Sequence, residues 1–179
     1  MYCGKNKTAL SSQQQIVDAL FTLLREKPYN AISVSTICSH AGISRQTFYS
    51  LFQSKDNVIT FALRNDCCYS ANESPSACSH SFRQICNGFG RYIIQHATVL
   101  EILTEYDLMP LLKTVLRDDF SKCFPRNLCC APNLQPYIID YLASGIASIA
   151  ETFIRTGQRS NPAELEDIIY LLMRGGYGE

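Results

Sequence analysis

The sequence predicts an all-α fold of about nine helices, with an N-terminal head of three helices that contains a helix-turn-helix, followed by a C-terminal helical domain. Apolar residues recur every three or four positions along most of the chain, which places them on one side of each helix. Strand-like alternation of useful length is absent from the sequence. Gly42, between two short helical patterns, predicts the tight turn that joins them.

The first helix is expected at residues 12–27. Its apolar stripe consists of Ile16, Ala19, Leu20, Leu23 and Leu24. Pro28 lacks a backbone N–H and disfavours helix in the residue before it, so this helix should end near Lys27.

Two short helices should follow, joined by a glycine turn. Ser33 can accept a hydrogen bond from a free amide at the start of the second helix, and Ser44 can do the same for the third. Gly42 occupies the position at which a chain leaving a helix often needs a positive φ. A helix, a short glycine turn and a second helix form a helix-turn-helix.

The third helix is expected to have two different faces. Its apolar face carries Phe48, Leu51 and Phe52. The opposite, polar face carries Arg45, Gln46, Thr47, Tyr49 and Ser50. Arginine and glutamine can form paired hydrogen bonds with guanine and adenine edges, threonine can contact a thymine methyl group, and hydroxyl groups can bind phosphates. An ordinary solvated face is the alternative, and Tyr49 could instead belong to the core.

A fourth helix should begin after Ser54, and its N-terminus and Lys55 could both bind a phosphate. The polar segment 66–81 then predicts a loop and a domain boundary. Formal charges sum to zero over the chain but are unevenly distributed, because residues 1–65 contain seven cations and three anions. A basic N-terminal third joined to an acidic remainder suits a head that binds a polyanion.

Five further helices are expected in the C-terminal domain, at residues 82–96, 98–106, 110–124, 136–156 and 162–174, with a second loop at 125–133. Pro110 and Pro162 fit first-turn positions, and Asn161 can cap the last helix. The helix at 136–156 is apolar over more than half its circumference. Such a helix is either central to its own domain or packs against a second copy.

The nine cysteines are odd in number and scattered, which argues against a disulfide framework. Those nearest to a zinc-ligand spacing are Cys67, Cys68 and Cys78, with His80, and they match no common zinc motif, so no metal or other cofactor is expected. Cys38 and Cys86 lie on apolar helix faces and are interpreted as small core residues.

An enzyme is not expected, because the sequence has no glycine-rich phosphate loop, nucleophile elbow or paired-carboxylate motif. Apolar runs remain shorter than the roughly 18 to 20 residues that span a bilayer. The first residues also lack the apolar segment of a secretory signal. We therefore expect a cytoplasmic protein.

The segment SVSTICSHAGISRQTFYSLFQSKDNVITFAL resembles the DNA-binding segment of the tetracycline-repressor (TetR) family, and the similarity covers residues 12–63. Ala41-Gly42-Ile43-Ser44 is similar to the turn of that family, Thr47-Phe48-Tyr49 to its recognition helix, and Ser54-Lys55 to the start of its fourth helix. The sequence of residues 45–49 is most similar to that of the subgroup of dihydroxyacetone-kinase regulators.

The resemblance implies a DNA-binding domain at residues 1–65 and an effector-binding and dimerisation domain at residues 66–179. Arg45, Gln46 and Thr47 would face bases, and Tyr49 and Lys55 would hold phosphates. Ser33 would cap its helix while touching the DNA backbone. The expected DNA-contacting set is Ser33, Ser44, Arg45, Gln46, Thr47, Tyr49 and Lys55.

The resemblance also implies a ligand pocket and a dimer formed by the helices at 136–156 and 162–174. Aromatic walls suit small-molecule sites, although aromatic residues at helical spacing are more often plain core. The candidate ligand contacts are Phe89, Tyr92, Tyr106, Phe120 and Tyr141. The candidate dimer contacts are Tyr141, Ile149, Phe153, Leu165, Ile169 and Leu172.

Together, these expectations predict a transcription regulator, most simply a repressor. It would bind a palindromic DNA operator as a homodimer and respond to a small-molecule effector. The alternative is a protein of the same fold that acts as a coactivator on a partner regulator.

Overall fold

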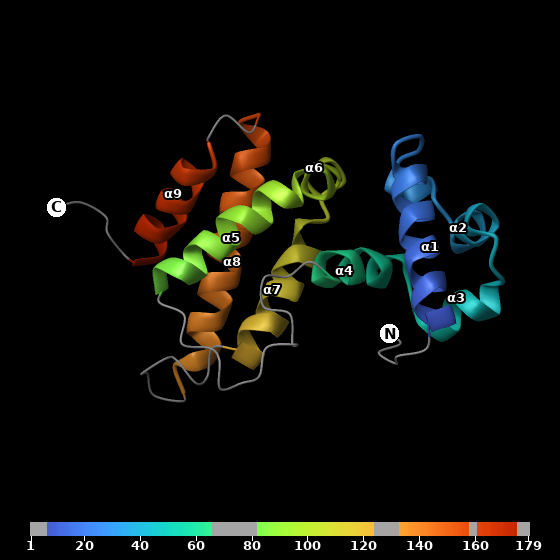
Figure 1. Cartoon of the computed structure of the whole chain (residues 1–179), viewed down its shortest axis with the longest axis horizontal. Coiled ribbons are helices and arrows are strands. Elements are labelled where there is room, and N and C mark those ends of the chain that lie inside the picture. Colours follow the sequence, from blue (N-terminus) through green and yellow to red (C-terminus); the bar gives the residue numbers. More distant parts are fainter. Residues whose placement is uncertain (1–6, 66–81, 124–132, 158–160, 175–179) are drawn as a thin grey trace. The chain divides into compact units, whose positions relative to one another are not determined.

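The computed structural model describes residues 7–65, 82–123, 133–157 and 161–174. Within these residues it contains nine α-helices, one short 3-10 turn and no strand (Figure 1). The all-α class predicted from the sequence is therefore confirmed. The predicted loop at 66–81 lies outside the described residues, as does the second predicted loop except for Asn133.

The chain divides into two compact units, Met1–Ala62 and Leu63–Glu179. The first unit contains α1 (Lys7–Leu24), the 3-10 turn η1 (Tyr29–Ala31), α2 (Val34–Ala41), α3 (Arg45–Leu51) and most of α4 (Lys55–Asn65). Its core combines side chains from all four helices, namely Ile16, Leu20, Ile37, Phe48, Phe52, Val58 and Ile59, each of them fully buried. α1 ends three residues before the position expected from the sequence, because Arg25, Glu26 and Lys27 form hydrogen-bonded turns ahead of Pro28.

Local signals define the starts of α2 and α3 as predicted. The Ser33 hydroxyl accepts a hydrogen bond from the Thr36 amide at 3.1 Å, and the Ser44 hydroxyl accepts one from the Thr47 amide at 3.0 Å. Gly42 follows α2 with a φ of 67°, a left-handed conformation that glycine adopts without steric cost. The glycine turn of the helix-turn-helix is thus confirmed.

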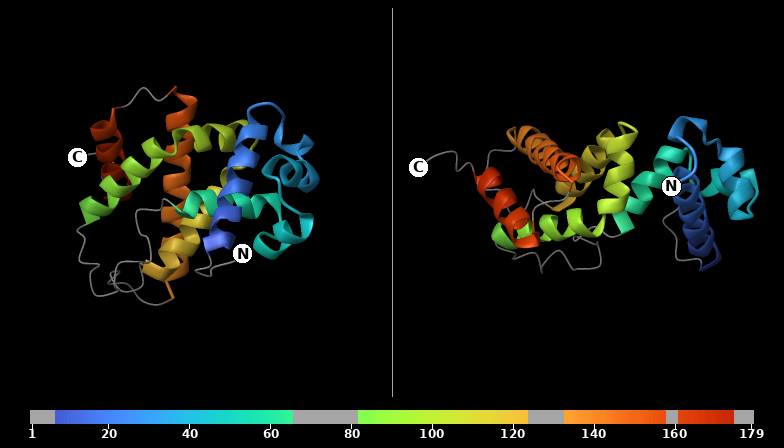
Figure 2. Two further views of the ribbon diagram at one scale, coloured as in Figure 1. Left: turned by 45° about the vertical axis from the view of Figure 1, so that its right-hand side comes forward. Right: turned by 90° about the horizontal axis from the view of Figure 1, so that it is seen from above.

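The second unit contains α5 (Phe82–Gln95), α6 (Ala97–Glu105), α7 (Met109–Cys123), α8 (Gln135–Arg155) and α9 (Pro162–Arg174). α5 lies against α9, whereas α6 and α7 pack on α8 (Figure 2). All five helices contribute fully buried side chains to this unit, including Ile93, Leu100, Leu112, Ala143 and Ile169.

Local signals also define both ends of the connection between α8 and α9. Gly157 has a φ of 73° just after α8. The Asn161 side chain accepts a hydrogen bond from the Glu164 amide at 2.9 Å, and the Glu164 carboxylate accepts one from the Asn161 amide at 3.2 Å. This reciprocal pair satisfies two amides at the start of α9, which begins at Pro162 as predicted.

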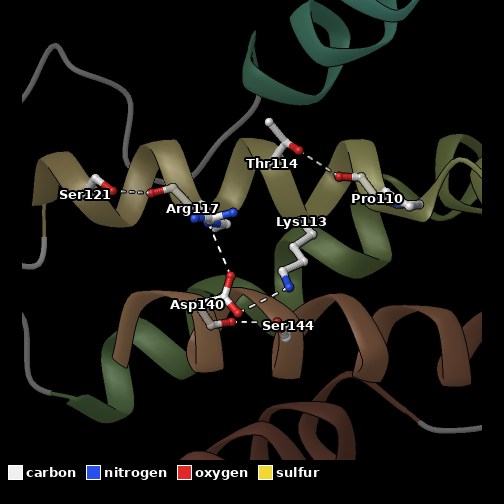
Figure 3. Close-up of polar contacts among 7 residues, drawn as sticks. All are labelled: Pro110, Lys113, Thr114, Arg117, Ser121, Asp140 and Ser144. Atoms are coloured by element: carbon white, nitrogen blue, oxygen red, sulfur yellow. Dashed lines mark hydrogen bonds and ion pairs between the residues drawn. The ribbon is translucent and has the colours of Figure 1, made fainter. Parts of the chain in front are cut away.

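Charged residues line the outer edge of the contact between α7 and α8. Lys113 Nζ and Arg117 Nε, one turn apart on α7, each lie 3.3 Å from a carboxylate oxygen of Asp140 on α8 (Figure 3). These side chains are about half exposed, so solvent screening limits their contribution to stability to at most about 1 kcal/mol.

α8 alone among the described helices is long and apolar enough, by length and composition, to cross a membrane. No membrane-spanning segment was expected from the sequence. The central helix of a water-soluble bundle satisfies the same criterion, and α8 packs here against α6, α7 and α9.

Candidate nucleic-acid interface

The two faces predicted for α3 are present in the structure. Phe48 is fully buried and Leu51 nearly so, whereas Arg45, Gln46 and Ser50 are exposed. Tyr49 is 56% exposed, so the alternative that it belongs to the core is wrong. α3 therefore presents arginine, amide and phenol groups to solvent from a helix that is anchored by its apolar side.

Two serines begin the helices of the helix-turn-helix and remain exposed. Besides accepting amide hydrogen bonds, Ser33 Oγ lies 2.9 Å from the Thr36 hydroxyl, and Ser44 Oγ lies 2.9 Å from the Thr47 hydroxyl. Each hydroxyl pair lies at the first turn of a helix. The N-terminal amides of a helix together with hydroxyl groups form a favourable environment for an anion.

Lys55 is the predicted site residue whose surroundings differ most from expectation. Its ammonium group donates to the backbone carbonyl oxygens of Tyr29 at 2.7 Å and Ile32 at 3.1 Å. The same group lies 3.9 Å from the centre of the Tyr29 ring. Sequence reasoning missed these contacts because Tyr29 and Lys55 are far apart in the chain and no local motif pairs them.

Asp56, the neighbour of Lys55, completes this cluster by accepting a hydrogen bond from the hydroxyl of Tyr29, which is 5% exposed. Burial raises the pKa of Tyr29, and its hydrogen bond to Asp56 and the charge of Asp56 raise it further, so the phenol remains a donor. Burial lowers the pKa of Lys55, an effect that the charge of Asp56 opposes.

The candidate ligand contacts fall into two groups. Phe89, Tyr92 and Phe120 are buried: the Phe89 and Phe120 rings meet edge to face at 5.3 Å, and Tyr92 stacks on His96 at 4.2 Å. The Tyr92 hydroxyl donates to the carbonyl of Leu63 at 3.0 Å. Tyr106 is partly buried, and Tyr141 is 55% exposed on α8. Tyr141 therefore does not join the buried aromatic residues.

The candidate dimer contacts also divide. Phe153, Leu165 and Ile169 are at most 6% exposed and pack inside their own unit. Ile149 and Leu172 are partly exposed. The large apolar residues of α9 that are most exposed are Ile168, at 39%, and Leu171, at 54%, which are not among the predicted dimer contacts. Between α8 and α9 lies an apolar hollow of about 320 Å³, lined by Ser148, Ile149, Thr152, Phe153, Thr156, Leu165, Ile168 and Leu172.

Cys38 and Cys86 are free and buried, as expected for small core residues. No group of three or more histidine, cysteine, aspartate or glutamate side chains is arranged to hold a metal within the described ranges. Cys67, Cys68, Cys78 and His80 lie outside those ranges.

The sequence model of a bacterial family, "Bacterial regulatory proteins, tetR family", matches residues 16–60. This segment covers the second half of α1, all of α2 and α3, and more than half of α4. Residues 16–60 of the N-terminal unit therefore match the TetR family. The predicted resemblance, and the helix-turn-helix that carries it, are thereby confirmed.

Part of the chain is also similar to a curated transcription regulator. The chain is 37% identical over 60 residues to the "HTH-type dhaKLM operon transcriptional activator DhaS" of Lactococcus lactis subsp. lactis (strain IL1403). The aligned segment spans about a third of each chain, 34% of this one and 32% of the relative. The expected similarity to the dihydroxyacetone-kinase subgroup is therefore confirmed over that segment.

Solved structures extend the likeness to the fold of the whole chain. A structure titled "Dihydroxyacetone kinase operon activator DhaS" has a TM-score of 0.58 at 22% identity and covers 92% of this chain and 95% of its own. Lin0861 from Listeria innocua has a TM-score of 0.80 at 16% identity, with coverages of 99% and 97%. A TetR transcriptional regulator from Streptococcus agalactiae 2603V has a TM-score of 0.59 at 16% identity, with coverages of 94% and 97%. At these identities the likeness establishes the fold.

The TetR-family proteins found in these comparisons are transcription regulators rather than enzymes. The match to the TetR family covers the helix-turn-helix region at residues 16–60, about a quarter of the chain.

Proposed function

We propose that this protein is a cytoplasmic regulator that binds a palindromic DNA operator as a homodimer through α3 and responds to a small-molecule effector. The observation that carries the proposal is the exposure of Arg45, Gln46 and Tyr49 on a recognition helix whose other face is anchored by Phe48. An exposed, rigidly mounted polar helix is what the major groove accommodates.

Direct base contacts are assigned to Arg45, Gln46 and Thr47, at the N-terminal end of α3. In helix-turn-helix proteins the N-terminal residues of the recognition helix reach the base edges. An arginine can bind both acceptors of a guanine, and a glutamine can bind an adenine. The Thr47 hydroxyl is engaged by Ser44, so a thymine methyl group is the contact that suits Thr47 best.

Backbone contacts are assigned to Ser33, Ser44 and Tyr49. Both serines lie at helix N-termini, where amide groups and the helix dipole favour a phosphate. Tyr49 is exposed on α3, so its hydroxyl is free to reach the sugar-phosphate backbone from the groove. Contacts of this kind position the head without reading the sequence.

A homodimer is supported by the surface of α8 and α9. Tyr141 on α8 and Ile168 and Leu171 on α9 are exposed, and Ile168 also lines the apolar hollow between the two helices. Exposed apolar surface of this kind is typical of a protein–protein interface. Two copies related by a two-fold axis would bury this patch and present two heads to the two halves of a palindrome. Tyr141, Ile149 and Leu172 remain in the interface, whereas Phe153, Leu165 and Ile169 support it from beneath.

The buried aromatic residues Phe89, Tyr92 and Phe120 are the proposed walls of an effector site, with Tyr106 at its edge. An effector that binds one arrangement of these helices more tightly than another would favour that arrangement. The resulting change in DNA affinity is limited by the difference between the effector's affinities for the two arrangements. Tyr141 is not part of this site in the present proposal, since its side chain is exposed.

Repression by occupation of the operator is the simplest outcome of such binding. Activation is the second candidate, because the curated relative that matches 60 residues of the chain is named as a transcriptional activator. An activator needs a surface for a partner in addition to the DNA-contacting face, and a coactivator relies on the partner for its place on DNA.

Sequencing of fragmented genomic DNA captured by the purified protein tests the proposal. We expect enrichment of a few fragments that share a palindromic motif, at near-physiological salt, because specific complexes exceed nonspecific ones by at least about a thousandfold in affinity. Recovery of the input distribution, with enrichment restored by a second regulator, would instead support the coactivator.

A further inference from the structure

The ammonium group of Lys55, on a partly exposed side chain, is bound to the protein's own backbone. A lysine ammonium has three N–H donors. Two of them are used by the carbonyl oxygens of Tyr29 and Ile32, and the Tyr29 ring lies beneath the same group at 3.9 Å. A phosphate could take up the third donor at most. Lys55 therefore differs from a surface lysine that is free to follow the DNA backbone.

The two carbonyl groups bound by Lys55 belong to the turn that leads directly into α2. Tyr29 begins η1, and Ile32 immediately precedes Ser33, the N-cap of α2. Lys55 is the first residue of α4. Its side chain consequently ties the start of α4 to the start of α2 across the first unit.

A second link joins the same two places. The buried Tyr29 donates its hydroxyl hydrogen to Asp56, in the first turn of α4. Because Asp56 is negative and Lys55 positive, the pair adds no net charge at this end of α4. Attraction of a phosphate by Lys55 is therefore offset in part by repulsion from its neighbour.

We propose that Tyr29, Lys55 and Asp56 are positioning residues that hold Ser33 and the start of α2 in place for the DNA backbone. This inference rests on the proposed function. Lys55 then contributes to DNA affinity through Ser33. Its removal would displace the contact between Ser33 and the DNA backbone, and would not remove an ion pair between Lys55 and a phosphate. Tyr29, which sequence reasoning did not select, becomes necessary for full affinity although it is buried.

Salt dependence separates this role from a phosphate contact. On a duplex recovered from genomic DNA, Lys55→Met and Tyr29→Phe should each weaken binding by about fivefold, as for one lost hydrogen bond, at every salt concentration. In both variants, the slope of log affinity against log salt should change no more than it does in Lys27→Met, the control substitution at an exposed lysine. A different result would overturn the proposal: a slope in Lys55→Met that is smaller by about 1 than in the control, while the slope in Tyr29→Phe equals that of the wild type. Lys55 would then be assigned to a phosphate contact.

A double-mutant cycle tests whether Lys55 acts through Ser33. In a Ser33→Ala background, Lys55→Met should cost clearly less affinity than in the wild type, because the contact it positions is already gone. Equal costs in both backgrounds would contradict positioning. Thermal unfolding of each variant identifies any that fails to fold, and Tyr29→Phe, which keeps the ring and every charge, is the mildest of them.

Amide hydrogen exchange of the DNA-free protein tests the positioning role of Tyr29, Lys55 and Asp56 without any operator. Tyr29→Phe should speed exchange of the Ile32 and Thr36 amides, which are bonded at η1 and at the Ser33 cap, and leave the Thr47 amide at the Ser44 cap unchanged. Unchanged exchange at Thr36 would overturn the positioning role. Failure of the wild-type protein to select any duplex would instead overturn the proposed function on which that role depends.

Discussion

Phe48 and Tyr49 are neighbours in the chain and meet edge to face at 5.5 Å, yet the first is fully buried and the second is 56% exposed. Successive residues of a helix point about 100° apart, so a single pair can separate the core of the head from its polar face. Phe48 fixes α3 to the first unit, and Tyr49 stands on the face proposed to meet DNA. The two aromatic residues therefore have separable effects.

Substitution of this pair should divide stability from DNA affinity. Phe48→Ala removes a fully buried ring and should lower the free energy of unfolding by about 3 to 5 kcal/mol. Tyr49→Ala should leave that free energy within about 0.5 kcal/mol and weaken DNA binding instead. Urea denaturation and fluorescence anisotropy on one duplex measure the two effects. Equal DNA affinity of Tyr49→Ala and the wild type would remove Tyr49 from the interface.

Close approach of α5 and α9 should make Gly90 intolerant of a side chain. A Cβ at Gly90 would lie 2.6 Å from Cγ and 3.4 Å from Cα of Glu166, so Gly90→Ala should cost about 1 to 3 kcal/mol through forced separation of the helices. Gly145→Ala is the matched control, because its Cβ would meet Met173 Sδ at an ordinary 3.6 Å and alanine favours helix. Denaturation midpoints that fall equally in both variants would contradict this packing.

The proposed dimer should depend on exposed residues of α9 and not on the buried ones. Leu171→Glu places a charge in the apolar patch and should shift the mass measured by light scattering from dimer to monomer at micromolar concentration. Leu10→Glu, a comparably exposed leucine of the first unit, should leave the mass unchanged. A monomeric wild-type protein would exclude this interface.

Buried thiols should resist alkylation in the native protein. Burial raises the pKa of Cys38 and raises that of Cys86 to about 11, so at pH 8 only about one Cys86 in a thousand is the reactive thiolate. Peptide mapping after brief iodoacetamide treatment should find both unmodified, and modified once urea unfolds the chain. Rapid native modification of Cys86 would mean that its thiol is accessible.

Local sequence signals predicted the helix starts that are set by a capping side chain and the turn that is set by a positive φ. Ser33, Ser44 and Asn161 each cap a helix, and Gly42 turns the chain with a positive φ, as the sequence alone indicated. These features depend on residues within four positions of one another, which is why they are legible without a structure.

Relationships between distant residues were not predictable in the same way. The Tyr29–Lys55 contact joins two segments with no shared motif, and it gives Lys55 a partner inside the protein. On α9 the helical period defined one broad apolar stripe, but packing on α5 and α8 decides that Leu165 and Ile169 are buried while Leu171 is exposed. Which half of such a stripe remains free depends on the neighbouring helices.

The central claim is that α3 reads DNA sequence, and parallel selections from a random duplex pool test it most directly. The wild-type protein should enrich a palindrome, and Arg45→Ala should bind that palindrome more weakly by about 1 to 3 kcal/mol and lose the preference at one base pair of each half-site. Arg25→Ala, an exposed arginine of the same unit, should retain the wild-type preference. No enrichment by the wild-type protein, or an unaltered preference in Arg45→Ala, would contradict the account.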